Sequence, residues 1–172
     1  VTLASAAMGV YIQQGDGGVY LQSHLSVLPK AGDYVEASGT AAMGVQSPYL
    51  RNAMWGVIAE KGPVVTPVEV SGRQVARGTH DGLLVAVTGR IVGNNLGSTS
   101  RPRLVYEIRT EDEFVIPLLV EDQELKAGAE NGAVVKAVGV ANIVGNPNTP
   151  NLKRPEILMA STRELEVLEG AA

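Results

Sequence analysis

The sequence predicts an all-β protein that consists of two small five-stranded barrels in tandem. Short stretches alternate between apolar and polar residues with a period of two, as strands with one buried face do. The pattern V-x-x-x-G-x-[A/I] occurs three times at intervals of 50 residues, starting at Val35, Val85 and Val135. The 172 residues include 20 glycines and 9 prolines, which is typical of short strands joined by tight turns.

The first and third copies of this pattern predict the same strand in two modules. Residues 28–33 (L-P-K-A-G-D) precede the first copy, and a similar Lys-Ala-Gly lies at 126–128, ahead of the third. The middle copy is then a different strand. The glycine in each copy fits a small barrel, because its strands must bend strongly to close, and Gly89 in particular predicts a bulge or bend. The alternative is chance recurrence in a chain rich in valine and glycine.

We therefore divide the chain into a first module (1–65), a linker or short helix (66–80) and a second module (81–172). In the linker, Thr66, Pro67 and Glu69 have the spacing of a capped helix start. The predicted strands of the first module are 1–5, 9–14, 19–23, 33–40 and 52–59, with a loop over 41–51. Those of the second module are 83–92, 103–109, 114–120, 134–144 and 157–168, with a polar loop over 93–102 and one or two helical turns over 121–129.

Alternation also predicts which side chains are buried. In the strand 103–109, Leu104, Tyr106 and Ile108 share one parity, so we expect Tyr106 in the core and Glu107 and Arg109 on the outside. In the first hairpin, one face carries only apolar side chains, namely Val10, Ile12, Val19 and Leu21.

Five short strands with a connector between the third and fourth, occurring twice, form the layout of the OB (oligonucleotide/oligosaccharide-binding) barrel. The strings GVYIQQGDGGVYLQ (9–22), KAGDYVEASG (30–39) and DGLLVAVTGRI (81–91) resemble tandem OB-like modules in the extracytoplasmic sensor region of bacterial histidine kinases and diguanylate cyclases. In that family, a hairpin F-I-Q-D-x-T-G-G-I-Y-V precedes a strand G-D-x-V-E-V-x-G, and Y-D-G-Q-x-V-x-V-x-G-x-V opens the second module. This chain differs by Gln14, where an acidic residue is usual, and by a truncated first strand.

The resemblance covers nearly the whole chain, and its motifs are turns and core positions. It implies a periplasmic or cell-surface sensory region of a larger signalling protein that recognises a small molecule or a protein partner. Similar single modules accompany some secreted nucleases. The family brings no catalytic residues and no cofactor. Because the chain begins at Val1 rather than Met, we expect a processed product or a fragment of a longer protein.

Composition argues against several functional classes. The formal net charge is −4, whereas proteins that bind nucleic acid usually carry an excess of Lys and Arg, so we do not expect nucleic acid as a partner. The lack of cysteine excludes disulfides and thiolate chemistry. No run approaches the roughly 18 apolar residues that span a bilayer, so we expect no membrane contact from this segment, although a flanking anchor is compatible with it.

No pattern of residues predicts catalysis, and we expect neither an enzyme nor a cofactor. His24 and His80 are far apart in sequence and lack a carboxylate cluster, so we expect no metal site. The run Gly15–Gly18 lacks the Lys-Ser/Thr of a phosphate loop and predicts a hairpin turn. The acidic residues 111–113 predict a solvated turn. A basic cluster of Arg101, Arg103 and Arg109 lies nearby in the sequence. We expect Glu107 and the acidic residues 111–113 to neutralise it in part.

One constellation predicts binding. Tyr11, Gln13, Tyr20 and Gln22 share a face of the first hairpin, which we expect to be an exposed platform. In OB barrels this face commonly binds ligands, and aromatic rings stack bases at about 1–3 kcal/mol each. The alternative functions are therefore single-stranded nucleic acid or oligosaccharide binding. Alternatively, the tyrosines cover the barrel or pack against the second module. A ligand in the groove between the barrels would change the angle between them.

Overall fold

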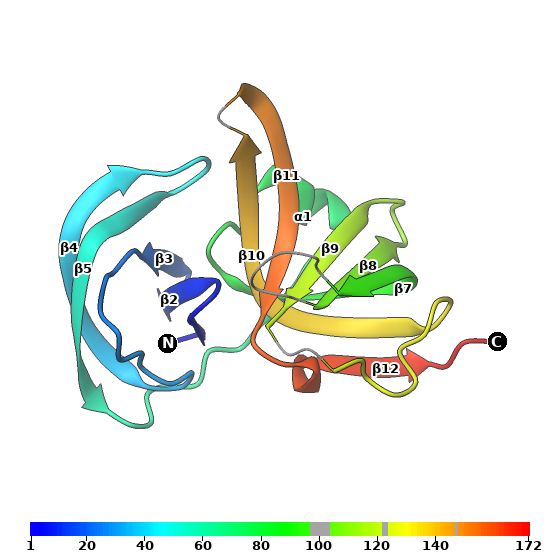
Figure 1. Ribbon diagram of the computed structural model, residues 1–172, viewed down its shortest axis with the longest axis horizontal. Helices are drawn as coiled ribbons and strands as arrows, with labels where there is room; N and C mark the ends of the chain where they lie inside the picture. The colour runs from blue at the N-terminus through cyan, green and yellow to red at the C-terminus, as the bar shows by residue number, and fades with distance from the viewer. Residues whose placement is uncertain (97–103, 122–123, 147) are drawn as a thin grey trace.

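The computed structural model describes residues 1–96, 104–121, 124–146 and 148–172, and it confirms an all-β chain with two β-rich bodies (Figure 1). The first body is a five-stranded sheet of β1 (Leu3–Ser5), β2 (Gly9–Gln14), β3 (Gly17–Leu21), β4 (Tyr34–Met43) and β5 (Pro48–Ala59). The second is a seven-stranded sheet of β6 (Val68–Glu69), β7 (Leu84–Leu96), β8 (Leu104–Thr110), β9 (Val115–Val120), β10 (Val134–Asn146), β11 (Thr149–Met159) and β12 (Leu165–Glu169).

Both modules have the strand order of an OB barrel. In the second, β7, β8 and β9 form an antiparallel meander, β9 runs parallel to β11, and β11 pairs with β10. Strand β10 then pairs with β7 and closes the barrel. The first module repeats the order as β1-β2-β3-β5-β4, with the same parallel contact between its third and fifth strands.

The first module differs in its closure. Within the described residues, β4 pairs with β5 and with no other strand, and β1 pairs only with β2. Strand β1 has three residues, whereas β7, its counterpart, has thirteen and pairs with β6, β8 and β10. The truncated first strand expected from the sequence therefore leaves the first barrel open on one side.

Burial follows the predicted parities. Tyr106 is 0% exposed, and its hydroxyl accepts a hydrogen bond from the backbone N–H of Lys126 at 2.9 Å, while Glu107 and Arg109 are exposed. In the first hairpin, Val10 and Leu21 are buried as predicted, and Ile12 and Val19 pack against them. The turn between β2 and β3 is shorter than predicted, because Gln14 already pairs with Gly17.

The loop predicted over 41–51 is wrong. Strand β4 continues to Met43 and β5 begins at Pro48, so the two form one long hairpin with its turn near Gly44 and Ser47. Proline is tolerated at the start of a strand, where its missing N–H costs no ladder bond. Gly39 lies at a register shift of this hairpin, between Ser38 and Thr40, which agrees with the bend expected of the repeated glycine. In β7 the shift lies after Ile91 rather than at Gly89.

The linker belongs to the second module. Strand β6 pairs in parallel with β7, and Val75 of the short helix α1 (Gly72–Arg77) is buried in the second core. The predicted helix start at Thr66 is wrong, because Val68 and Glu69 are in β6. The capping box exists five residues later, where the Ser71 side chain accepts from Gln74 N and the Gln74 side chain accepts from Ser71 N.

Two further expectations fail in the second module. The described part of 121–129 forms turns and no helix, and the single strand predicted over 157–168 is divided between β11, a 3-10 turn (Thr162–Glu164) and β12. Residues 93–96 of the predicted polar loop continue β7, and 97–103 lie outside the described residues. In the described segments, no helix is long and apolar enough to cross a membrane.

Candidate ligand site between the two modules

The tyrosine face of the first hairpin points toward the second module. Tyr11 is 6% exposed and packs in a cluster with Leu3 and Met8 of its own module and Val140 and Leu158 of the other. The prediction of an exposed platform is therefore wrong for Tyr11. The second module covers this face, as in the alternative that the tyrosines pack against it.

The glutamines of the same face have other surroundings. Gln13 Oε1 accepts a hydrogen bond from the backbone N–H of Leu84 at 2.8 Å, so it ties β2 to the first residue of β7. Gln22 is half-buried, and its backbone N–H donates to the carbonyl of Leu50 at 2.8 Å. Neither glutamine lines the cleft that Tyr11 and Tyr20 share, and a ligand-binding role for the four residues stays a prediction.

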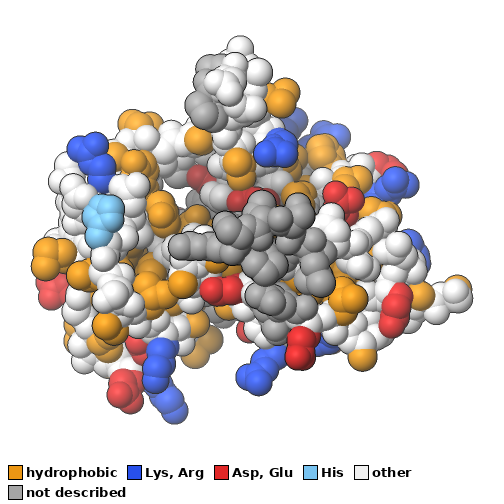
Figure 2. Space-filling model, in the orientation of Figure 1, with side chains coloured by type: hydrophobic (Ala, Val, Ile, Leu, Met, Phe, Trp, Pro, Cys, Tyr) orange, Lys and Arg blue, Asp and Glu red, His pale blue; other side chains and the backbone are white. Residues whose placement is uncertain are grey.

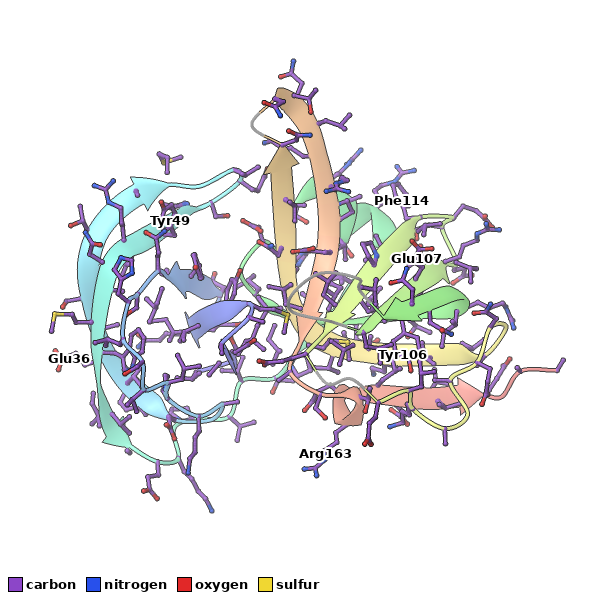
Figure 3. All side chains as sticks on the ribbon, in the orientation of Figure 1. Glu36, Tyr49, Tyr106, Glu107, Phe114 and Arg163 are labelled. Atoms are coloured by element: carbon purple, nitrogen blue, oxygen red, sulfur yellow. The ribbon has the colours of Figure 1, made fainter. Side chains whose placement is uncertain are left out.

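A cleft of about 350 Å³ lies between the modules. Three tyrosines from β2, β3 and β5 lie along it: the ring centroids of Tyr11 and Tyr20 are 5.2 Å apart, and those of Tyr20 and Tyr49 are 5.9 Å apart. Tyr49 lies on the inner side of the curved hairpin of β4 and β5, whereas Glu36 points outward (Figure 3). The second module lines the cleft with Asp81, Gly82, Asn142 and Ile143.

Asp81 is the acidic group of this cleft. Its Oδ1 accepts a hydrogen bond from the backbone N–H of Ile143 at 2.9 Å. Burial raises the pKa of the Asp81 carboxyl, and hydrogen bonds from Ser47 and Ile143 together with the charge of Lys153 partly oppose this rise. The carboxylate is therefore held in a half-buried position at a cost in solvation, which is common for groups that contact ligands.

Burial also raises the pKa values of the tyrosines. For Tyr11 the loss of solvation is the largest cause, followed by repulsion from Tyr20, Asp81 and Glu156. For Tyr20 the causes are burial and then Tyr49. Both phenols are therefore neutral at physiological pH, so the cleft offers aromatic rings, hydroxyl groups and one carboxylate.

The tip of the hairpin of β4 and β5 forms one wall of the cleft. Lys153 Nζ on β11 donates a hydrogen bond to Gln46 Oε1 at 3.0 Å. Val45 lies close to Gly145: a Cβ atom added to Gly145 would be 2.8 Å from a methyl group of Val45. The sequence predicted a loop over these residues, so this wall was missed. Nothing in the sequence around Pro48 and Tyr49 indicated that this hairpin would contact β10 and β11.

The other candidates do not form sites. His24 is exposed, and His80 contacts Thr79 through Nδ1 at 3.0 Å. Within the described part of the chain, no three His, Cys, Asp or Glu side chains are placed to hold a metal ion. Arg101 and Arg103 lie outside the described residues.

Asp112 lies on an exposed turn, as expected, and it also has a structural role. Its carboxylate accepts from the backbone N–H groups of Gly72 and Arg73 at the start of α1 and from the Thr110 hydroxyl at 2.6 Å. The Thr110 bond is the largest cause that lowers the pKa of Asp112, followed by the Arg73 backbone bond. Asp112 thus caps the helix from a distant turn.

No protein-family model and no curated protein matches this chain.

Proposed function

We propose that the protein is a non-catalytic binding module that recognises a small molecule in the cleft between its two OB-like bodies. We further propose that it is the exported, periplasmic or cell-surface sensory region of a bacterial signalling protein, as the sequence resemblance implies. The observation that supports binding most is the arrangement of Tyr11, Tyr20 and Tyr49 of one module opposite Asp81 of the other.

The size and chemistry of the cleft suit a small polar ligand. Small-molecule sites usually measure about 300–1,000 Å³ and combine apolar or aromatic walls with a few polar groups. A cleft of about 350 Å³ is at the lower end of this range. A ligand with a hydrogen-bond donor for Asp81 and a flat face for Tyr49 would contact both modules.

A ligand that contacts both modules can act as a signal. It shifts the equilibrium between two relative orientations of the modules only if it binds one orientation more tightly. At the hairpin tip, such a shift would alter the hydrogen bond between Lys153 and Gln46 and the contact of Val45 with Gly145. A partner protein bound to the rim of the cleft would act by the same principle.

A thermal-shift screen with a library of polar metabolites tests binding. Compounds that raise the melting temperature are then titrated by calorimetry against the wild type, Tyr49→Ala and Asp81→Asn. We expect each cleft variant to weaken binding at least tenfold, which corresponds to about 1.4 kcal/mol. Tyr34→Ala is the matched control, because Tyr34 is an exposed tyrosine of β4 that does not line the cleft. Unchanged affinity in both cleft variants would refute the site.

The signalling step needs its own measurement. Because the chain has no cysteine, Glu36→Cys and Glu111→Cys introduce two unique labelling positions, one in each module. Spin labels there report the distance between the modules. We expect saturating ligand to change the distance distribution. An unchanged distribution with a bound ligand would reject the change of angle while leaving binding intact.

The alternative of single-stranded nucleic acid binding through Tyr11 and Tyr20 has less support. Stacking needs an accessible ring face, and Tyr11 is 6% exposed. The net charge of −4 also opposes contact with phosphates. We therefore propose that the cleft, which Tyr11 and Tyr20 line together with Tyr49 and Asp81, binds a small molecule rather than nucleic acid.

A further inference from the structure

The cleft between the modules carries a negative charge. Of the described residues that line it, Asp81 is the one with a charged side chain, and none is a lysine, arginine or histidine. On the face of the molecule shown in Figure 2, most Lys and Arg side chains lie at the outer margins of the two bodies. An anionic ligand would therefore meet a like charge in the cleft, whereas a cation would meet an opposite one.

The Asp81 carboxylate has hydrogen-bonding capacity for a ligand. A carboxylate has about four acceptor positions, and Ile143 and Ser47 donate to this one. Within the described ranges Asp81 forms no salt bridge, because Lys153, whose charge acts on it, donates its ammonium group to Gln46 instead. A cationic ligand that donates N–H groups to Asp81 would therefore neutralise a half-buried charge and occupy its remaining acceptor positions.

The two side-chain amides of the cleft already have partners within the protein. Asn142 Nδ2 donates to Glu156 Oε1 at 2.8 Å, and Gln46 Oε1 accepts from Lys153 at 3.0 Å. A neutral polyol exchanges hydrogen bonds with water for hydrogen bonds with its site and gains little from each, and here it would also compete with these internal bonds. The polar groups of the cleft therefore favour a charged donor for Asp81 over a neutral polyol.

Three neutral tyrosine rings offer a second contact for a cation. The centroids of Tyr11 and Tyr20 are 5.2 Å apart and those of Tyr20 and Tyr49 are 5.9 Å apart, and neighbouring rings are tilted by 37° and 38°. The face of an aromatic ring attracts a cation that lies within about 6 Å of the ring centre. Tyr20 and Tyr49 are half-buried and line the cleft, so a ligand there can contact their rings.

The electrostatic potential at the tyrosines has the same sign as that at Asp81. After burial and repulsion from Tyr20, the charges of Asp81 and Glu156 further raise the pKa of the Tyr11 hydroxyl. Two carboxylates thus act on the aromatic side of the cleft. A negative potential of this kind attracts cations and raises their local concentration.

The aromatic rings are held in place by the protein. A Cβ added to Gly9 would lie 2.5 Å from a ring carbon of Tyr20, so this ring packs closely against the glycine. Tyr11 is buried in the cluster that includes Val140 and Leu158 of the second module. Rings that are already ordered cost less conformational entropy when a ligand binds to them.

We propose that the cleft binds a small organic cation of the guanidinium type, which donates N–H groups to Asp81 of one module and stacks on Tyr20 and Tyr49 of the other. The inference rests on the proposed function, because it names the class of ligand for the same cleft. A guanidinium group combines paired N–H donors that match a carboxylate with a flat cationic face that stacks on aromatic rings. A quaternary ammonium ion has the charge but lacks the donors.

Three small probes with the same alkyl chain test the ligand class. n-Butylguanidinium carries the proposed group, n-butylurea is its neutral planar counterpart, and n-butyltrimethylammonium is a cation without N–H donors. Each probe is titrated into the ¹⁵N-labelled full chain at pH 7 and equal ionic strength, and the backbone amide shifts of Gly82, Asn142 and Ile143 report on the cleft. We expect n-butylguanidinium to bind at least tenfold more tightly than n-butylurea and at least threefold more tightly than n-butyltrimethylammonium.

Variants test whether Asp81 and the rings cause this preference. In Asp81→Asn, the ratio of the affinities for n-butylguanidinium and n-butylurea should fall to about twofold or less. Glu36→Gln is the matched control, because it removes the same charge from an exposed side chain that points outward, and it should keep the full preference (Figure 3). Tyr49→Ala is an independent second variant and should weaken binding of n-butylguanidinium at least tenfold. The dispersion of the amide spectrum shows whether each variant is folded.

The outcomes distinguish this inference from the proposed function. The guanidinium class would be overturned, with the cleft intact as a binding site, if n-butylurea or n-butyltrimethylammonium bound as tightly as n-butylguanidinium. The same conclusion would follow if the thermal-shift screen gave neutral or anionic compounds that bind the cleft while n-butylguanidinium does not. An unchanged preference in Asp81→Asn would overturn the pairing with the carboxylate. If no probe and no compound of the screen shifted the cleft amides, the proposed function would fail as well.

Discussion

Gly18 and Gly82 determine how closely the two modules approach. A Cβ at Gly18 would lie 2.2 Å from the carbonyl oxygen of Gly82, a contact with backbone that cannot move aside easily. The turn glycine Gly17 has open surroundings by comparison, with only the carbonyl of Gln14 at 3.5 Å. Neighbouring glycines of one hairpin thus have different roles.

This difference gives a direct prediction. Gly18→Ala should lower the free energy of unfolding by about 1–3 kcal/mol, because overpacking forces the backbones of the modules apart. Gly17→Ala is the matched control and should change it by less than about 0.5 kcal/mol. Urea unfolding measures both. Equal effects of the two variants would contradict the close approach of Gly18 and Gly82.

Asp81 predicts a pH dependence. Its pKa is raised in the folded protein, chiefly by burial. The folded state therefore binds the proton more tightly than the unfolded state, whose pKa is about 3.9. The resulting stabilisation is present below about pH 4 and is lost as the pH rises through the folded pKa. Asp81→Asn removes this dependence and keeps an acceptor for Ile143 N.

The free energy of unfolding of Asp81→Asn, relative to the wild type, should therefore increase between pH 4 and pH 7. Urea titrations at pH 4, 5 and 7 measure it. A difference that stays constant over this range would show that burial of the carboxylate has no cost. A stabilising Asn that also weakens ligand binding would indicate that Asp81 is retained for function.

The sequence predicts which residues share a face, and it does not predict what covers that face. Alternation placed Tyr11 and Tyr20 together and Tyr106 in the core, and the structure agrees on both. It placed Tyr11 at the surface, which is wrong, because the covering residues Val140 and Leu158 are more than a hundred positions away. The position of Asp81 in the cleft was not predicted for the same reason, because the residues around it are distant in sequence.

At the level of elements, the helix α1 depends on a distant turn. It has six residues, too few to be stable alone, and Asp112 accepts two of its first backbone N–H groups. The sequence showed a capping pattern at Thr66, and the cap that the structure uses, Ser71, was not predicted. Pairing of Val68 and Glu69 with β7 decides this, because those residues are then extended.

Asp112→Ala should lower the free energy of unfolding by about 0.5–2 kcal/mol, the usual effect of removing a helix cap. The neighbouring exposed residue Glu111 provides the control, and Glu111→Ala should have little effect. The pKa of Asp112 is lowered in the folded state, so its contribution is present above about pH 4 and declines as the pH falls below that value. Urea unfolding at pH 7 and pH 3 measures both effects. Equal losses in the two variants would rule out the cap.

The lengths of the strands were harder to predict than their existence. The hairpin of β4 and β5 was predicted as two strands with an eleven-residue loop, because Gly44 and Pro48 are residue types common in turns and loops. The partner strand provides the missing information: Ala42 pairs with Tyr49 and Met43 with Pro48. The extra length takes the hairpin tip to the second module, where it forms a wall of the cleft.

At the level of the whole molecule, the two modules should differ in stability. Among the described residues, three buried residues form the main cluster of the first module and eighteen form that of the second. Hydrophobic burial is the dominant stabilising contribution. We expect the first module to unfold at lower urea concentration. Trp55, the single tryptophan, reports on the first module by fluorescence, and far-UV circular dichroism reports on both. Coincident transitions by the two probes would show that contacts between the modules make the chain one cooperative unit.

The pairing of β7 with both β8 and β10 has a consequence for biosynthesis. One part of this strand pairs with β8, which follows it directly, but Leu84 pairs with Val140, which the ribosome adds much later. Until β10 has left the exit tunnel, the apolar inner side of the nascent meander lacks the buried residues of β10 and β11 that cover it in the folded protein. The second module can therefore complete folding only after most of its chain has been translated, and this interval is when a chaperone would be expected to bind.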